Sequence, residues 1–408
     1  MKRMADRGDT AGDSSMKGSP RRFQRWAAHC VLYFLVVLAG CSANAGFGPF
    51  KPTFHHEQLS PLTISNFHRI AAFTRLVPST DPDIIYGIST FLAQGQAHPR
   101  ALVAIDGAIY VTNLDGSNAK KVDLSYPCYS PGVSANGDWL ACPNETDQSH
   151  DAPQLQVASL SPGADTSFHV ALLDGPGFYL YPAWTPDGKM LAILHDQINT
   201  SSGCFTSLYS SLPPYLSFKH VTEIEVNIPT IKMWDGCDIS GLAWSPDGKW
   251  LAINGGGGIA FVALTSLLQT YVAASGAVPE RIELPDTAIQ PVAVEPSDGN
   301  RLSLSASSMT WNPRSGAFTY LSISDTPSLA EEIITYDPTL SQQRVALRIP
   351  LANSAQSGVT DISNREHLDA ITWTPDGHDM LVVVGQNFGC VDCAVTYPSD
   401  VYLYTSTP

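Results

Sequence analysis

A short motif that recurs along the chain constrains its fold more than any other feature. It reads "YPAWTPDGKMLAIL" at residues 181–194, "GLAWSPDGKWLAIN" at 241–254 and "DAITWTPDGHDMLVVV" at 369–384. Two weaker copies, at 130–143 and 308–323, keep the apolar second half. An internal repeat with a period of tens of residues predicts a solenoid, a propeller or another array of stacked units.

Each copy has the chemistry of a tight β-hairpin. Proline and glycine in the Ser/Thr-Pro-Asp-Gly segment favour a bulged reverse turn between two short apolar strands. The turn residues, which we expect to be structural rather than metal-binding, are Asp187, Gly188, Asp247, Gly248, Asp376 and Gly377. The first strand ends in a large residue at Trp184, Trp244, Trp311 and Trp373, and in Val133 in the first copy. Two strands alone are marginal in water, so each hairpin needs more strands and a neighbouring sheet, and tryptophan can fill the gap between sheets.

The W-[ST]-P-D-G-K motif followed by an apolar strand, together with "IYVTNLDGS" at residues 109–117, resembles the blades of TolB-type β-propellers. The resemblance covers residues 75–408 and implies four-stranded antiparallel blades around a channel. Five hairpins and a worn copy at 84–112 predict six blades, with five or seven as alternatives. The last blade lacks an outer strand, which residues 64–74 could supply, so we assign an all-β, six-bladed propeller to residues 63–408.

The first 40 residues are expected to be an export signal rather than part of the fold. Arg21, Arg22 and Arg25 precede a short apolar run at 30–38, and small residues lead to Cys41. This order is typical of a secretory signal peptide, and the run is too short to span a membrane. Its ending resembles a bacterial lipobox, which implies cleavage before Cys41 and lipidation of that cysteine. A plain signal peptide and a short buried helix are the alternatives.

The segments beside this leader also carry expectations. Met16 is a second candidate for the true start, because residues 1–15 are long and acidic for such a leader. Residues 41–62 are rich in Gly, Pro, Ser and Ala and predict a flexible tether. The net charge of −15 argues against a nucleic-acid partner, since phosphate binding needs a basic face. From the leader and its lipidated cysteine we expect a monomer held by its lipid on the extracytoplasmic side of the cell membrane or outer membrane.

Six cysteines follow the leader, and an even number in an exported protein suggests disulfides. They are Cys128, Cys142, Cys204, Cys237, Cys390 and Cys393. Cys128 and Cys142 flank the Val133 hairpin symmetrically, so we expect them to face each other within reach of a bond. Cys390 and Cys393 would close a short loop, with a redox motif or half a zinc site as alternatives. Cys204 with Cys237 follows by elimination.

No catalytic constellation is recognisable. The chain lacks a G-x-S-x-G elbow, and Ser60 stands where an H-E-x-x-H motif beginning at His56 would need its second histidine. The glycine run at 255–258 lacks the lysine and the helix of a phosphate-binding loop. We therefore assign no catalytic, cofactor-binding or metal-binding residue.

Aromatic residues gather in one segment that could bind a partner. Residues 204–218 hold Phe205, Tyr209, Tyr215 and Phe218 among serines and prolines. Aromatic side chains make good contact surfaces, so this segment is a candidate binding loop. The alternative interpretation is that alternate members pack into the third blade as a strand.

Two functional hypotheses remain at this stage. The first is a lipid-anchored propeller of the cell envelope that binds or scaffolds a protein, peptide or glycan without a cofactor and without chemistry of its own. The second is an envelope enzyme, such as a propeller lactonase, lyase or glycan-active hydrolase, whose polar residues gather at the channel mouth, with or without a metal. Propellers host both classes, so the fold alone does not decide between them.

Overall fold

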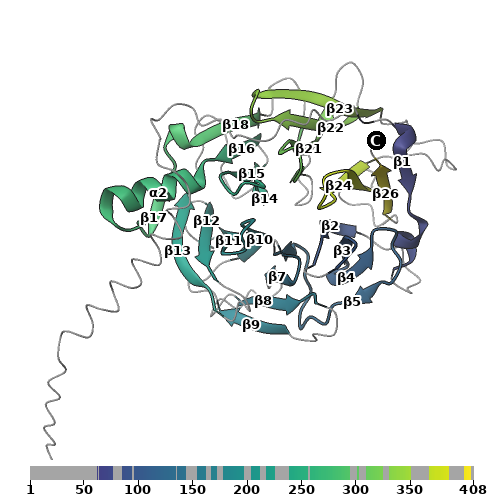
Figure 1. Ribbon diagram of the computed structural model, residues 1–408, viewed down its shortest axis with the longest axis horizontal. Coiled ribbons are helices and arrows are strands. Elements are labelled where there is room, and N and C mark those ends of the chain that lie inside the picture. Colours follow the sequence, from purple (N-terminus) through teal and green to yellow (C-terminus); the bar gives the residue numbers. More distant parts are fainter. Residues whose placement is uncertain are drawn as a thin grey trace, which may run out of the picture. The chain divides into compact units, whose positions relative to one another are not determined.

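Six sheets surround a central axis in the computed structural model of the chain (Figure 1). The structure describes residues 62, 64–76, 85–93, 96–134, 136–143, 154–161, 167–171, 178–196, 204–211, 217–225, 239–255, 258–294, 301–302, 309–324, 330–350, 367–385 and 399–405. The chain divides into a unit of residues 1–48, which lies outside the described residues, and a unit of residues 49–408 that holds the sheets. The expected leader and nearly all of the expected tether therefore lie outside the described residues.

Each sheet is one blade, and its strands follow one another from the axis outward. Blade 1 comprises β2 (Ile85–Phe91), β3 (Arg100–Ile105), β4 (Ala108–Asn113) and β5 (Lys120–Lys121). Blade 2 comprises β6 (Gly132–Val133), β7 (Trp139–Pro143), β8 (Gln154–Ser159) and β9 (Ser167–Ala171). Blade 3 comprises β10 (Phe178–Trp184), β11 (Met190–Asp196), β12 (Cys204–Ser210) and β13 (Lys219–Glu225).

The second half of the ring repeats this plan. Blade 4 comprises β14 (Ile239–Trp244), β15 (Leu251–Gly255), β16 (Gly258–Val262) and β18 (Ile289–Val294). Blade 5 comprises β19 (Arg301–Leu302) and β20 (Met309–Trp311), which both pair with β21 (Phe318–Ser324), then β22 (Ala330–Asp337) and β23 (Gln342–Pro350). Blade 6 comprises β24 (His367–Trp373), β25 (Asp379–Gly385), β26 (Asp400–Thr405) and β1 (Phe67–Arg69). The prediction of six blades is confirmed.

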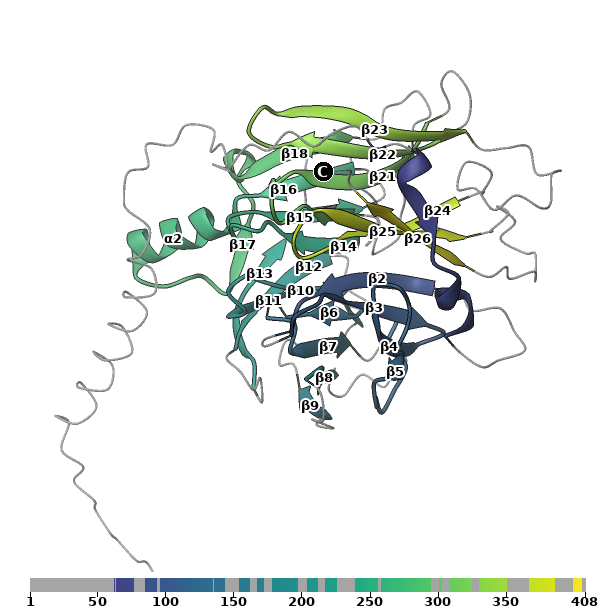
Figure 2. The same cartoon turned by 45° about the vertical axis from the view of Figure 1, so that its right-hand side comes forward.

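The N-terminal strand closes the ring. β1 pairs antiparallel with β26, Phe67 opposite Tyr404 and Arg69 opposite Tyr402. Arg69 also donates from Nε and Nη2 to Oδ1 of Asp400, at 2.9 and 2.6 Å. The expectation that residues 64–74 complete the last blade is confirmed, because both ends of the domain lie in one sheet (Figures 1 and 2).

Blade 4 carries an insertion that the repeat pattern did not predict. Helix α2 (Leu264–Ser275) and strand β17 (Arg281–Glu283) lie between β16 and β18 in the chain. β17 leaves its own blade and pairs in parallel with β13 at the outer edge of blade 3, beside α2 (Figure 1). Arg281 holds it there with an ion pair to Glu223, Nη2 to Oε2 at 2.8 Å. β17 therefore ties blades 3 and 4 together.

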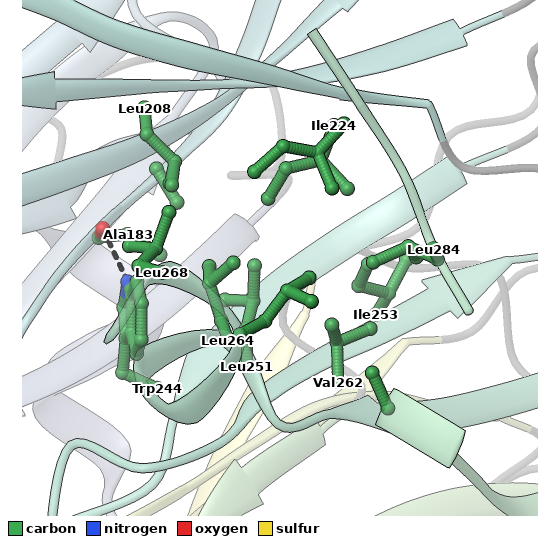
Figure 3. Close-up of a cluster of buried hydrophobic side chains, with 14 of the residues drawn as sticks. Ala183, Leu208, Ile224, Trp244, Leu251, Ile253, Val262, Leu264, Leu268 and Leu284 are labelled. Carbon is green, nitrogen blue, oxygen red and sulfur yellow. Dashed lines mark hydrogen bonds between the residues drawn. The ribbon is translucent and has the colours of Figure 1, made fainter. Parts of the chain in front are cut away.

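Apolar side chains fill the space between neighbouring blades. Between blades 3 and 4, Leu208 and Ile224 meet Leu251 and Ile253 beneath α2, whose Leu264 is fully buried (Figure 3). Equivalent clusters lie at the other junctions, so each hairpin stabilises the next by apolar burial. In the described part of the chain, no helix is both long and apolar enough to cross a membrane.

Candidate functional site

The axis of the ring holds a channel with a volume of about 590 Å³. All six blades line it through their innermost strands or the residues beside them. Pockets of this size accept small ligands or the end of a larger one. The channel is therefore the candidate functional site.

The tryptophans of the repeat close the junctions around this channel. They occupy matching positions, since the partners of Trp184, Trp244, Trp311 and Trp373 in the next strand are Leu191, Leu251, Phe318 and Met380. Three of these indoles donate Nε1–H to the innermost strand of the preceding blade. The acceptors for Trp184, Trp244 and Trp311 are the carbonyls of Gly132, Ala183 and Ala243, at 3.2, 3.1 and 3.2 Å (Figure 3 for Trp244). These three indoles therefore link adjacent sheets, through a hydrogen bond to the inner strand that the sequence analysis did not predict.

The remaining junctions depart from this rule. Trp373 donates to the hydroxyl of Thr319 at 3.0 Å instead of to a carbonyl. By the same strand register, Thr90 and Val133 take the tryptophan position in blades 1 and 2. The channel wall is consequently not sixfold symmetric.

One level of the wall consists of the residue that precedes the tryptophan position in each blade. We call this set the channel ring; its members in blade order are Ser89, Gly132, Ala183, Ala243, Thr310 and Thr372. The ring has two halves. Blades 5, 6 and 1 contribute hydroxyl groups, whereas blades 2, 3 and 4 contribute glycine and alanine.

The described wall of the channel is uncharged. None of the described residues that line it is Asp, Glu, His, Lys or Arg. Nor do three His, Cys, Asp or Glu side chains lie close enough anywhere among the described residues to hold a metal ion. The wall offers hydroxyls, aromatic edges and proline rings, which suit an uncharged ligand.

A strained residue lies on the wall between blades 2 and 3. Tyr181 has φ 53°, a left-handed conformation that is unusual for a bulky side chain, at the bulge between Leu180 and Ala183. Its backbone N–H donates to the hydroxyl of Ser130 at 3.3 Å. Gly132 lies against the bulge so closely that a Cβ there would be 2.2 Å from the carbonyl oxygen of Pro182. Backbone strain of this kind gathers at functional sites.

The aspartates of the repeat are structural residues of the turns. Asp187 accepts from the hydroxyl of Thr185 at 2.7 Å and from the backbone N–H of Lys189 at 3.0 Å, and Asp376 does the same with Thr374 and His378. Burial opposes the charge of both carboxylates, but these donors outweigh burial and hold the pKa values of Asp187 and Asp376 below the usual range.

The structure describes only part of the aromatic segment at residues 204–218, and two of its aromatic side chains are buried in the core. Tyr209 is 1% exposed and Phe218 6% exposed, and both pack against Trp184 at the junction of blades 2 and 3. These two side chains are therefore core and offer no contact surface, as the alternative interpretation held. Phe205 lies in β12, the third strand of blade 3, and Tyr215 lies outside the described residues.

The cysteines are described only in part. Cys128 and Cys142 lie at disulfide distance with their Cα atoms 5.8 Å apart, and both are fully buried. Cys237, Cys390, Cys393 and the proposed lipidation site Cys41 lie outside the described residues, and the partner expected for Cys204 lies among them. The three remaining assignments stay predictions.

No protein-family model matches the sequence, and no curated protein matches it. Solved propellers do match the structure. A putative TolB from Agrobacterium tumefaciens is 13% identical, with a TM-score of 0.44 over 80% of this chain and 92% of that one. TolB from Acinetobacter baumannii is 13% identical, with a TM-score of 0.42 over 73% of this chain and 60% of that one.

The fold is a six-bladed β-propeller. An oligogalacturonate lyase from Vibrio parahaemolyticus matches this propeller as well, at 11% identity and a TM-score of 0.44 over 78% of this chain and 75% of that one. At such identities the likeness concerns the fold alone, and the site must be interpreted from its own residues.

Proposed function

We propose that the protein is a lipid-anchored binding module of the cell envelope whose ligand enters the central channel. The observation that carries this proposal is the channel itself: about 590 Å³, reached by all six blades and uncharged along its described wall. General acid–base catalysis most often uses an imidazole or a carboxylate, and metal-assisted hydrolysis needs His, Asp or Glu side chains to hold the metal. The described wall provides none of these groups, so binding without chemistry suits it better than the enzymatic hypothesis.

The anchoring half of the proposal rests on the leader. A positive segment, a short apolar run and Cys41 precede the domain, and two or three acyl chains on one cysteine would hold it firmly at a membrane. The replacement Cys41→Ala should release the protein from the membrane fraction and abolish incorporation of labelled fatty acid. Cys30→Ala, inside the leader, is the matched control and should change neither result. Membrane retention of the Cys41→Ala variant with its leader removed would contradict lipid anchoring.

The binding half is tested at the channel. Ala243 is half-buried on the channel ring, so Ala243→Leu narrows the channel without adding charge. Solubilised envelope components captured by the wild-type protein should be lost from this variant while its thermal unfolding midpoint stays close to that of the wild type. Capture that is the same for both proteins would place the binding site elsewhere.

A further inference from the structure

The two halves of the channel ring differ in what they can offer a ligand. Ser89 and Thr310 are half-buried on the channel wall. Within the described part of the chain neither hydroxyl makes a hydrogen bond. Thr372, between them in blade order, makes only a long contact of 3.5 Å to the carbonyl of Trp373. Three hydroxyls in consecutive blades thus face the ligand space with hydrogen-bonding capacity to spare, because each can donate one bond and accept two.

The opposite half presents a smooth apolar surface. Gly132, Ala183 and Ala243 bring little or no side chain to the ring, and their carbonyls already accept the indole N–H groups of the next blade. A ligand that touches this half therefore meets methyl groups and covered backbone. The channel combines one hydrogen-bonding wall with one apolar wall at the same level.

This arrangement disfavours the two common modes of peptide recognition. Strand addition uses a run of free backbone groups on a sheet edge, and the inner edges of blades 2, 3 and 4 have these carbonyls occupied. Recognition of proline-rich segments uses grooves lined by several open aromatic faces. The four repeat tryptophans are only 4–7% exposed, and among the described aromatic residues of the wall only Tyr129 and Tyr181 are half-buried. Side-chain hydroxyls must then do most of the polar recognition.

We propose that the channel binds the end of a neutral glycan, with Ser89, Thr310 and Thr372 as its polar contacts. The proposal rests on the channel being the ligand site, as proposed above. Sugar hydroxyls donate and accept like those of serine and threonine, and the C–H face of a sugar ring matches the surface of Gly132, Ala183 and Ala243. The absence of Lys and Arg from the described wall selects against anionic sugars, whose carboxylates would be left without a partner. Tyr129 and the strained Tyr181, both half-buried on the wall, add aromatic contacts at the junction of blades 2 and 3.

The test is a titration of the full-length protein in detergent with defined saccharides. Chitotriose, cellotriose and maltotriose are the neutral probes, and trigalacturonic acid is the anionic probe of similar size. We expect at least one neutral trisaccharide to bind and the anionic one to bind at least about tenfold more weakly. Ser89→Ala and Thr310→Val should each weaken the binding of that trisaccharide about fivefold, the usual effect of losing one hydrogen bond.

Matched variants and a second ligand class separate this inference from the proposed function. Thr270→Val and Ser275→Ala, on the exposed face of α2, delete hydroxyls away from the channel and should leave the affinity unchanged.

If no neutral saccharide binds at ~10 mM, where even millimolar affinities would register, the glycan assignment is overturned. An uncharged Ser/Pro peptide that binds the wild type but not Ala243→Leu would then leave the channel as a peptide site. If Ala243→Leu affects the binding of neither class, the channel is not the ligand site and the proposed function fails with it. Should Ala243→Leu not fold, the two hydroxyl deletions still decide the glycan assignment.

Discussion

At the residue scale, the same Pro-Asp-Gly turn occurs in three blades, but the space around its glycine differs between the copies. The glycine that closes it has a left-handed backbone in each strong copy, with φ of 67°, 68° and 70° at Gly188, Gly248 and Gly377. Any side chain is strained in this conformation, but the space around the glycine differs. A Cβ on Gly248 would lie 3.6 Å from its nearest neighbour, whereas a Cβ on Gly377 would lie 2.6 Å from Oδ1 of Asn312.

This difference predicts unequal costs for the same replacement. Gly248→Ala should lower the free energy of unfolding by about 1 kcal/mol, the usual cost of a left-handed alanine. Gly377→Ala should cost about 3 kcal/mol, because it also displaces Asn312, which donates from Nδ2 to the carbonyl of Gly377 at 2.8 Å across the junction of blades 5 and 6. Denaturant unfolding of the two variants measures both values. Equal losses would show that the close contact at Gly377 relaxes without cost.

The turn aspartates predict a pH dependence with a definite sign. The pKa values of Asp187 and Asp376 lie below the usual range in the folded protein, so the stability that they contribute is present above the unfolded pKa of about 4 and is lost as the pH falls through the folded values. The double variant Asp187→Asn, Asp376→Asn should therefore lose less stability than the wild type between about pH 5 and pH 2.

Asparagine is a suitable replacement because blade 2 already uses it. Asn136 stands at the aspartate position there, and its Oδ1 accepts from the hydroxyl of Ser134 at 2.6 Å and from the backbone N–H of Asp138 at 3.3 Å. Asp123→Asn, an exposed position outside these turns, is the control. If stability falls equally with pH in the wild type and the double variant, the two aspartates do not carry this pH dependence.

At the scale of the element, sequence reasoning predicted the hairpins and missed the connections between them. The Pro-Asp-Gly turn, the apolar strand and the tryptophan are local features, so residues 181–194 and 241–254 reveal their structure directly. Helix α2 and strand β17 follow from no repeat, because β17 pairs with a strand of another blade that lies 58 residues away at Arg281 and Glu223. Two members of the channel ring, Thr310 and Thr372, can be recognised from the sequence because each directly precedes a repeat tryptophan. Ser89 cannot be recognised in this way, because the residue that follows it is Thr90 instead of tryptophan.

The tryptophans allow a prediction about the junctions. Trp244→Phe keeps most of the ring but leaves the buried carbonyl of Ala183 without its donor, so it should cost about 1–3 kcal/mol. Trp250, in the same hairpin, is equally buried, and its Nε1 finds no acceptor in the described part of the chain. Trp250→Phe removes that unsatisfied N–H and should cost clearly less. Thermal unfolding of both variants decides whether the indole hydrogen bond or the ring volume holds the blades together.

At the scale of the whole molecule, the ring closes through the pairing of β1 with β26, which we call the seam. β1 and β26 lie at opposite ends of the domain sequence and form one sheet, in which Phe67 packs against Tyr404 with ring centroids 5.0 Å apart. A closed ring has no open junction between its first and last blades, so the seam couples the two ends of the chain.

The seam should fail before the rest of the ring. Arg69→Met removes the cation that faces Asp400, a side chain only 3% exposed. Arg348→Met is the matched control, because Arg348 pairs at 2.7 Å with Glu332, 7% exposed, inside blade 5. Each replacement should lower the free energy of unfolding by about 1–2 kcal/mol, between the values for exposed and buried pairs. Only Arg69→Met should also speed amide hydrogen exchange in β1 and β26 well above that in β14 and β15, because local opening of a ring begins at its weakest closure. Uniform acceleration across all blades would mean that the ring opens as a single unit and that the seam has no stability of its own.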